Sequence, residues 1–199
     1  MLKGNREYKN YTDEQLINEF KDGINPAFDE IVYRYKDRVV NFLFRYTGNR
    51  DDSEDLAQDA FIKLYRSKHL YQEIAKFSTW FYTIAINIAK TYVKKKNKLS
   101  TLSISDYDPE NDKDFDIPAN VLEPDEETNA RIENYYIQKA INSLDDTYKE
   151  AIILRDIQDL DYEEIAKILD IPIGTVKSKI NRGREKLKVI LKDIYKPND

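Results

Sequence analysis

The chain contains no cysteine, one histidine and one tryptophan among 199 residues, and only five glycines and six prolines. Without cysteine there is no disulfide framework and no thiolate nucleophile, which suits a reducing compartment. No apolar run approaches the ~20 residues that a membrane-spanning helix needs, and the N-terminal residues contain no apolar signal-peptide segment. Scarce glycine and proline with 35% charged residues favour helices. We therefore expect a soluble, cytoplasmic, all-α protein without membrane insertion.

The shortage of histidine also limits the chemistry open to the chain. A carboxylate-bridged metal bundle needs Glu-x-x-His pairs, and His69 is the only histidine. The residues for nucleophilic catalysis by a Ser–His or Cys–His pair are also lacking. We therefore predict no catalytic residue, no metal site and no cofactor, and we do not expect an enzyme.

Charge is distributed unevenly along a chain whose formal net charge is -5. Residues 106–127 hold ten carboxylates and one lysine, whereas residues 90–98 hold five lysines and no acid. Residues 177–192 hold seven basic residues against Glu185 alone. Two basic segments are thus separated by an acidic one, a pattern typical of local anion binding rather than of uniform solubility.

Apolar spacing divides the chain into two helical parts. Residues 13–98 show apolar positions three to four residues apart. Pro26 separates the first two helices, Gly48-Asn49 ends the second, and Asp51 or Asp52 is the expected N-cap of the third. The three-part division predicted is a helical bundle over 1–98, an acidic flexible linker over 99–130, and a second small helical domain over 131–199.

The second domain contains the spacing of a helix-turn-helix. Residues 162–169 form a short amphipathic pattern, residues 170–172 (Asp-Ile-Pro) form a turn, and a second helix follows with Val176 and Ile180 on its inner face. Glycine is the commonest residue in that turn, but Asp170 tolerates a left-handed backbone better than most residues.

The outward face of this second helix is expected to carry polar and basic side chains that reach phosphates and base edges. These are Thr175, Lys177, Ser178, Asn181 and Arg182. The alternative is that a lysine-rich C-terminal helix only complements its own dipole and remains solvated.

Two segments of the first domain carry the remaining signals. In DDSEDLAQDAFIKLYR, residues 51–66, the side chains of Asp55, Gln58 and Asp59 share an acidic exposed face, which on periodicity alone is only a solvated surface. In FSTWFYTIAINIAKTYVKKKNK, residues 77–98, Trp80 stands at core spacing and the lysines face outward.

Taken together, these segments closely resemble the extracytoplasmic-function (ECF) group of sigma factors in the sigma-70 family, over nearly the whole chain. DSEDLAQDAF resembles the helix that binds core RNA polymerase, and FSTWFYTIAINIAK resembles the −10 promoter segment. The segment LDDTYKEAIILRDIQDLDYEEIAKILDIPIGTVKSKINRGREKL resembles the −35 domain.

The resemblance implies a dissociable initiation subunit that recognises the double-stranded −35 element and holds the single-stranded −10 element. Polymerase binding is then expected at Asp55, Gln58 and Asp59. Contacts with −10 DNA are expected at Tyr71, Phe77, Asn87, Lys90, Lys94 and Lys95, and Trp80 is assigned to core packing. Contacts with −35 DNA are expected at the five residues of the second helix, although lysine stands at positions 177 and 179, where the family often has arginine.

The resemblance also implies partners and leaves one alternative. The acidic linker would enter a basic channel of the polymerase or act as a passive tether. An anti-sigma protein is a partner that the family allows and that no residue here identifies. The competing interpretation is a free-standing helix-turn-helix regulator that binds DNA without polymerase.

Overall fold

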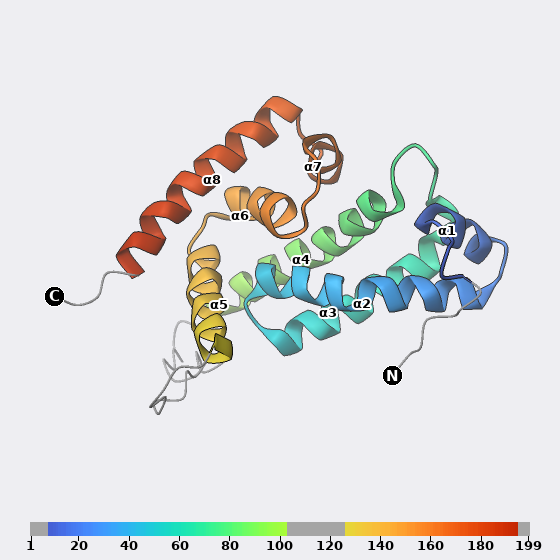
Figure 1. The fold of residues 1–199 in the computed structure, drawn as a ribbon, viewed down its shortest axis with the longest axis horizontal. Coiled ribbons are helices and arrows are strands. Elements are labelled where there is room, and N and C mark those ends of the chain that lie inside the picture. Colours follow the sequence, from blue (N-terminus) through green and yellow to red (C-terminus); the bar gives the residue numbers. More distant parts are fainter. Residues whose placement is uncertain (1–7, 103–125, 195–199) are drawn as a thin grey trace.

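The computed structural model describes residues 8–102 and 126–194, and within them every element is helical (Figure 1). The expected all-α fold is confirmed. The N-terminal half contains α1 (Asp13–Lys21), α2 (Asn25–Thr47), α3 (Arg50–Ser67), the short 3₁₀ helix η1 (Lys68–Leu70) and α4 (Phe77–Leu102). The C-terminal half contains α5 (Glu126–Asn142), α6 (Asp146–Ile152), the π-helical turn η3 (Ile153–Ile157), α7 (Tyr162–Leu169) and α8 (Ile173–Ile194).

Helix boundaries in the first half follow local chemistry. Pro26 lies in the first turn of α2, where its missing N–H costs nothing. Gly48 closes α2 with a left-handed backbone, φ +76°, that glycine adopts readily. The N-cap of α3 is Asn49, whose side chain accepts the N–H of Asp52 at 2.7 Å. The expectation of Asp51 or Asp52 as N-cap is therefore wrong, since both lie in the first turn, where carboxylates favour the helix dipole.

The ends of the predicted linker are helical. Helix α4 continues to Leu102 and α5 begins at Glu126, so residues 99–102 and 126–130 belong to helices rather than to an extended connection. The rest of the predicted acidic linker lies outside the described residues.

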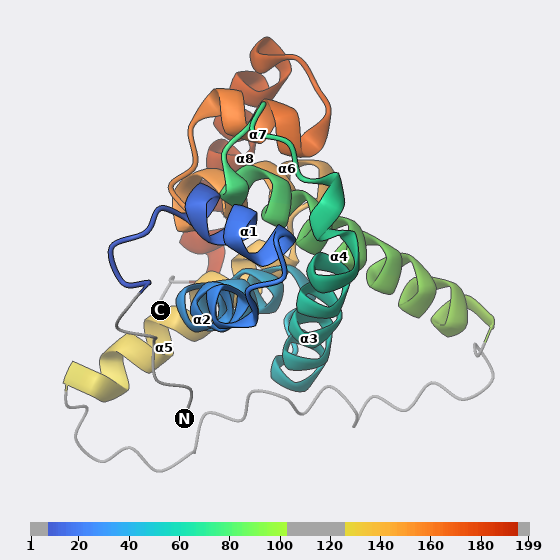
Figure 2. The same cartoon turned by 90° about the vertical axis from the view of Figure 1, so that its right-hand side faces the viewer.

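The apolar core is continuous through both halves. It includes Phe81 and Ala85 of α4, and it extends to Ile152, Ile165 and Val176 of the C-terminal half. Figures 1 and 2 show the C-terminal helices lying against α4 and α2, while the last turns of α4 project away from the rest of the molecule. The predicted helical parts therefore pack together as one body in this structure.

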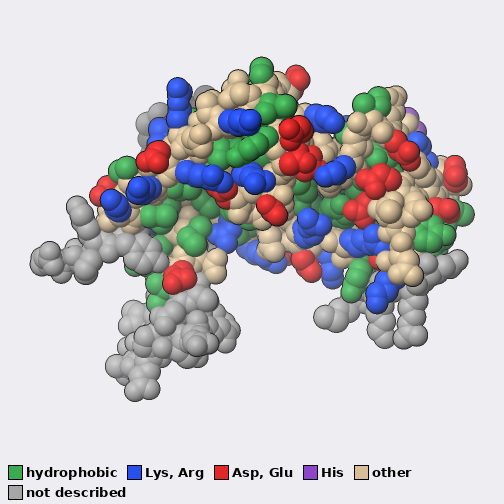
Figure 3. Space-filling model, turned by 45° about the horizontal axis from the view of Figure 1, so that its top comes forward, with side chains coloured by type: hydrophobic (Ala, Val, Ile, Leu, Met, Phe, Trp, Pro, Cys, Tyr) green, Lys and Arg blue, Asp and Glu red, His purple; other side chains and the backbone are tan. Residues whose placement is uncertain are grey.

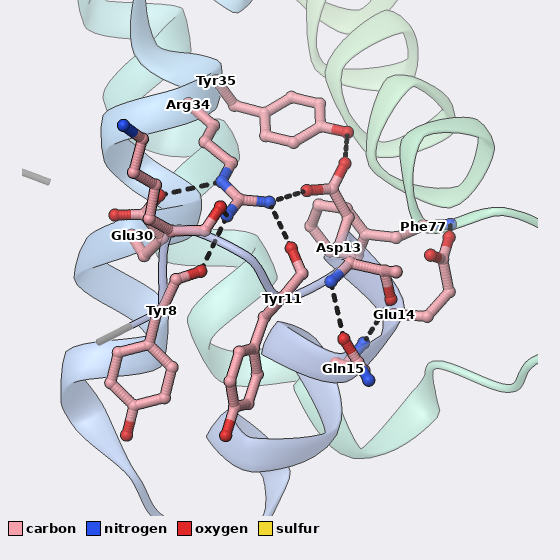
Figure 4. Close-up of polar contacts among 11 residues, drawn as sticks. Tyr8, Tyr11, Asp13, Glu14, Gln15, Glu30, Arg34, Tyr35 and Phe77 are labelled. Carbon is pink, nitrogen blue, oxygen red and sulfur yellow. Dashed lines mark hydrogen bonds and ion pairs between the residues drawn. The ribbon is translucent and has the colours of Figure 1, made fainter. Parts of the chain in front are cut away.

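Arg34 of α2 fixes the segment that precedes α1 (Figure 4). Its guanidinium donates to the backbone oxygens of Tyr8 and Tyr11 at 2.9 and 2.8 Å, and to the carboxylates of Asp13 and Glu30, each at 2.9 Å. Because one planar group serves partners from three segments, α1 is held against α2 at a defined angle.

Helix α1 in turn fixes the start of α4. The carboxylate of Glu14 accepts the backbone N–H of Phe77 at 2.9 Å, which satisfies one of the free donors in the first turn of α4 (Figure 4). The second carboxylate oxygen of Asp13 accepts the hydroxyl of Tyr35 at 2.6 Å. The segment that carries the predicted −10 residues is thus anchored from its N-terminal end.

Candidate nucleic-acid and polymerase interfaces

Helices α7 and α8 form the predicted helix-turn-helix. Helix α7 spans the same residues that the sequence predicts, and Asp170 in the turn has the expected left-handed backbone, with φ +53°. Val176 and Ile180 are completely buried, which confirms them as the inner face of α8. Ala166 of α7 is half-buried and packs against the apolar core.

The outward face of α8 has the exposure that a DNA-reading surface needs. Lys177, Ser178, Asn181 and Arg182 are exposed, and Thr175 is half-buried. The hydroxyl of Ser178 donates to the backbone oxygen of Thr175 at 2.9 Å. Figure 3 shows Lys and Arg side chains spread over the part of the surface that the C-terminal helices form. The structure thus brings four of the five predicted residues to one exposed helix face; their contact with DNA remains a prediction.

A neighbouring arginine on α8 has a different role. The guanidinium of Arg184 donates two hydrogen bonds to the carboxylate of Asp156 in η3. The bond from Nε of Arg184 is 3.0 Å long. This pair ties α8 to the preceding turn. Arg184 is therefore a structural cation, two residues from the predicted reader Arg182.

A capping box fixes the start of α7. The carboxylate of Asp161 accepts the backbone N–H of Glu164 at 2.7 Å, and the carboxylate of Glu164 accepts the N–H of Asp161 at 3.0 Å. The hydrogen bond from the Glu164 N–H is the largest cause of a lowered pKa at Asp161. The ionised form of this carboxylate thus stabilises the folded helix.

Replacing the cap is expected to lower stability in a pH-dependent way. Asp161→Ala should lower the free energy of unfolding at pH 7 by about 1 kcal/mol, because the Glu164 N–H loses its partner. Since the folded pKa of Asp161 lies below its unfolded value, the ionised form contributes fully above the unfolded pKa and its contribution is lost as pH falls through the folded value. Asp161→Asn keeps a capping oxygen without a titrating group, so urea unfolding should show less loss on acidification than in the unmodified chain. Equal acid sensitivity in both proteins would contradict this assignment.

The acidic face of α3 is exposed as predicted. Asp55, Gln58 and Asp59 are all exposed on one side of the helix. Next to them lies an apolar groove of about 430 Å³ between α2 and α3. It is lined by Phe28, Val32, Gln58, Phe61, Ile62, Tyr65 and Arg66.

The apolar groove is a feature that the sequence analysis missed. Ile62 is 48% exposed and Tyr65 is 47% exposed. Both lie outside the buried face of α3, which Leu56, Ala60 and Leu64 form. Two large apolar side chains outside that face were the sequence signal that could have predicted the groove. An acidic patch beside exposed apolar side chains is a suitable surface for another protein.

Two of the residues predicted to lie near the −10 strand are buried in the core. Tyr71 is 1% exposed and Phe77 is 0% exposed, and their ring centroids lie 6.0 Å apart. The hydroxyl of Tyr71 donates to the backbone oxygen of Ala75 at 3.0 Å, and burial raises its pKa to about 12. Neither ring is exposed to a base in this conformation, and contact of these two residues with the −10 strand remains a prediction.

The exposed side chains of the loop before α4 are different ones. Leu70 is 62% exposed and Ile74 is 79% exposed. The expectation was based on the resemblance to the family's −10 segment. In the structure Tyr71 and Phe77 pack against Trp80, so these aromatic side chains lie inward and the aliphatic ones lie outside.

The other predicted −10 residues lie along α4. Asn87, Lys94 and Lys95 are exposed, and Lys90 is half-buried. The ammonium of Lys90 lies 3.0 Å from the carboxylate of Glu150 in α6.

A second groove, of about 560 Å³, runs between α3 and α4. Asn87 and Lys95 lie on its α4 side, and Asp59 lies on its α3 side. Trp80 forms part of its wall and is also packed against the core, so the expected core role accounts for only part of its surface. This groove brings members of the two predicted N-terminal sites to one surface.

The described residues form neither a metal-binding cluster nor a membrane-spanning helix. Among residues 8–102 and 126–194, no group of three or more His, Cys, Asp or Glu side chains is placed to hold a metal ion. Within the same ranges, no helix combines the length and hydropathy of a membrane span.

Family models match both halves of the chain. The model described as "Sigma-70 region 2" matches residues 31–99, which include α3 and most of α4. The model described as "Sigma-70, region 4" matches residues 135–187, which include the helix-turn-helix.

Curated relatives are similar over almost their full length. The chain is 37% identical over 183 residues to the ECF RNA polymerase sigma factor SigW of Bacillus subtilis, covering 91% of this chain and 97% of the relative. It is 35% identical over 177 residues to the ECF RNA polymerase sigma-E factor of Escherichia coli K12, covering 87% of this chain and 91% of the relative.

Solved structures share the fold. CnrH, solved in complex with the cytosolic domain of CnrY, superposes with a TM-score of 0.68 at 20% identity and covers 91% of this chain and 97% of its own. The sigma factor RpoE of Bartonella quintana, solved in complex with the anti-sigma factor NepR, gives 0.66 at 24% identity and covers 83% and 96%. At these identities the likeness concerns the arrangement of helices.

Proposed function

The chain belongs to the ECF group of the sigma-70 family, whose members direct transcription initiation by RNA polymerase, and we propose that it recognises −35 and −10 promoter elements and stabilises the melted −10 strand. The observation that carries the proposal is that the chain has both kinds of surface that the function needs. Helix α8 has an exposed polar and basic face, and the N-terminal half has an exposed acidic face on α3 followed by the basic helix α4. It would act in the cytoplasm, with core polymerase and promoter DNA as partners. The domain division proposed is 1–98 for core binding and the −10 element, and 131–199 for the −35 element.

Recognition of the −35 element is assigned to α8. Lys177, Ser178, Asn181 and Arg182 are exposed on a helix whose inner face is fixed by buried Val176 and Ile180. An α-helix fits the major groove, where arginine binds guanine through two hydrogen bonds and lysine binds as a point charge. We therefore assign base reading chiefly to Arg182 and Asn181, and assign Lys177 to phosphate contact.

Arg182→Ala is expected to reduce transcription from a promoter that depends on its −35 element by about 5- to 150-fold, the range of ~1–3 kcal/mol per bidentate base contact. Run-off transcription with core polymerase measures it. Arg184→Ala is the matched control, because that guanidinium is already paired with the carboxylate of Asp156 in the same chain. If Arg182→Ala weakened all DNA sequences equally, Arg182 would contact phosphate and the assignment of base reading to it would fail.

Capture of the −10 strand is assigned to the exposed side of α4. Asn87 offers a hydrogen-bonding amide beside the groove between α3 and α4, and Lys94 and Lys95 supply cations about two helical turns further on. A base extruded from the duplex costs a few kcal/mol of unstacking, and stacking on an aromatic surface returns about 1–3 kcal/mol. Trp80 and Tyr92, which both line the groove, are the aromatic side chains available there.

Binding to core polymerase is assigned to the acidic face of α3 with the apolar groove beside it. Asp55, Gln58 and Asp59 supply charge and hydrogen bonding, and Ile62 and Tyr65 supply exposed apolar area. This combination suits a basic partner surface with an apolar centre, because charge sets orientation and buried apolar contacts supply affinity.

The complete proposal is tested by run-off transcription with core polymerase on a library of promoters. The expected result is a defined set of start sites that appears only when the chain is present. Transcripts that begin at the same places without it would overturn the proposal.

An anti-sigma protein is proposed as a further partner. The structure of the Bartonella quintana sigma factor, which shares this fold, holds such a protein. The apolar groove between α2 and α3 and the groove between α3 and α4 are two surfaces, among the described residues, with room for an apolar segment of a partner. Co-purification from the native host followed by identification of bound proteins is the measurement.

A further inference from the structure

The last turns of α4 carry four exposed lysines, Lys94, Lys95, Lys96 and Lys98. Figure 2 shows that these turns project away from the rest of the molecule. In the sequence the four side chains are equivalent, because each is a long cation in one basic run. The structure distinguishes one of them, Lys96, from the others.

Lys96 is held against the start of α3. Its ammonium lies 3.4 Å from the carboxylate of Asp52, which also accepts a hydrogen bond from the hydroxyl of Tyr92. The same ammonium lies 5.7 Å from the centroid of the Tyr92 ring. One carboxylate of α3 thus binds donors from two successive turns of α4, and one of these donors is a cation.

The carboxylate of Asp52 is a fixed anion. It lies in the first turn of α3, where the helix dipole favours negative charge, and the backbone N–H of Asp52 donates to the side chain of Asn49 at 2.7 Å. Burial and the hydrogen bond to Asp52 raise the pKa of Tyr92, which keeps that hydroxyl protonated as a donor. Because the anion is already held in place, pairing with it costs Lys96 only the freedom of its own side chain.

Helical spacing places Lys96 on the opposite side of α4 from Asn87. At 3.6 residues per turn, positions seven and eleven residues after Asn87 lie within about 20° of it, whereas a position nine residues after it lies about 180° away. The first two positions are Lys94 and Lys98, and the third is Lys96. Asn87, Lys94 and Lys98 therefore share one exposed face, which we call the outer face of α4.

Lys94 and Lys98 supply the charge of the outer face. Among residues 8–102 and 126–194, neither of these two lysines has a carboxylate partner. They lie about 6 Å apart along the helix axis, so both ammonium groups can reach phosphates of one strand. Lys98 was not among the residues that the sequence analysis assigned to the −10 strand.

We propose that Asp52 determines which lysines of α4 bind the −10 strand. It holds Lys96 against α3, and it leaves Lys94 and Lys98 beside Asn87 as contacts of that strand. Lys98 is thus a further DNA-binding residue, and Lys96 is not one. The inference deepens the proposed function and rests on the assignment of the −10 strand to α4.

The salt dependence of DNA binding tests this proposal. Each phosphate that a cation neutralises changes the slope of log affinity against log salt by about 0.7 on a single strand. The probe is a labelled oligonucleotide with the non-template −10 strand of a promoter found by run-off transcription. It is titrated with the full chain bound to core polymerase in about 50 to 200 mM KCl, and fluorescence anisotropy gives the affinity at each concentration.

Three single variants separate the lysines. Lys94→Gln and Lys98→Gln should each reduce the slope by about 0.7, so affinity falls about 2.6-fold less over this roughly fourfold range of salt. Lys96→Gln removes the same charge from the same helix and should leave the slope unchanged. All three positions are exposed, and circular dichroism checks that helix content is retained. Equal slopes in the three variants overturn the proposal.

Asp52→Asn tests the selecting group itself. The amide oxygen still accepts the hydroxyl of Tyr92, but the charge that holds Lys96 is gone, so the slope should become steeper by about 0.7. Adding Lys96→Gln to Asp52→Asn should return the slope to its original value, which a purely structural role of Asp52 does not predict. Asp51→Asn makes the same charge change at an exposed position of the same turn and should leave the slope unchanged. A slope in Asp52→Asn equal to that in Asp51→Asn also overturns the proposal.

Failure of the inference and failure of the proposed function give different results. If the unmodified chain does not increase the affinity of core polymerase for the oligonucleotide, the proposed −10 function and the selection by Asp52 are both wrong. If it does, and Lys96→Gln reduces the slope as Lys98→Gln does, the selection is wrong while the proposed −10 function stands.

Discussion

Core polymerase is expected to bind the double variant Asp55→Lys with Gln58→Ala about 100-fold more weakly than the unmodified chain. Both side chains are exposed on one face of α3 and are directed away from the core. Reversing one charge turns an attraction to a basic partner surface into repulsion, and removing the amide takes away a hydrogen bond. Together these changes are worth roughly 3 kcal/mol, which is a factor of about 100 in affinity. Fluorescence anisotropy of the labelled chain titrated with core polymerase measures the change.

The control for this variant is Asp37→Lys, which makes the same charge reversal at an exposed position of α2. It should bind core polymerase within about threefold of the unmodified chain, since mutations of exposed residues outside an interface have small effects. Circular dichroism should show unchanged helix content in both proteins. Equal binding by the double variant and this control would remove α3 from the proposed interface.

Gly183→Val is expected to lower the free energy of unfolding by about 2 to 3 kcal/mol and to abolish −35-dependent transcription. Gly183 is buried where α8 crosses α6, and a Cβ there would lie 2.8 Å from Cγ1 of Ile152 and 3.4 Å from Cβ of Tyr148. Because Ile152 is itself 2% exposed, it has nowhere to move, and the extra methyl groups must displace α8. Displacement moves the exposed face of α8 away from its position over α7.

Gly174→Val provides the matched control for stability. A Cβ at that position meets nothing within 4 Å, so the same substitution in the same helix should change the free energy of unfolding by less than about 0.5 kcal/mol. Urea unfolding followed by circular dichroism gives both values. A Gly183→Val protein as stable as the Gly174→Val protein would show that α6 and α8 are not packed as described.

The helix-turn-helix was predictable because its pattern is local. Its first helix, the turn at Asp170 and the burial of Val176 and Ile180 all depend on contacts between residues close in sequence. Three local features predict the same structure there. They are the apolar period of the helices, a turn residue that tolerates a left-handed backbone, and Pro172 shortly after it. Where several local signals agree, sequence reasoning succeeds.

The burial of Tyr71 and Phe77 was not predicted, because it depends on tertiary packing. Tyr71 lies in the short connection between η1 and α4, which shows no period, and Phe77 is the first residue of α4. In the structure Tyr71 packs against Trp80, Phe77 packs against Trp80 and Phe81, and Ile74 is exposed instead. An aromatic residue in a functional loop is thus not enough to assign it to a ligand.

The contact between the two halves could not be predicted from the sequence for a similar reason. Glu150 and Lys90 are 60 positions apart, and either side chain alone reads as a solvated charge. Their pairing depends on how α6 lies on α4, which no periodicity reports. The apolar groove beside Gln58 is formed by side chains of both α2 and α3, so the sequence of either helix alone does not predict it.

Arg34 binds the N-terminal segment through main-chain oxygens of Tyr8, Lys9 and Tyr11. Every amino acid supplies such an oxygen, so this anchoring places no demand on which side chains precede α1, whereas position 34 itself needs the five donors of a guanidinium. Over evolutionary time the stretch just before α1 is therefore free to diverge among relatives as far as this anchor is concerned, and a change at position 34 would require a compensating change elsewhere.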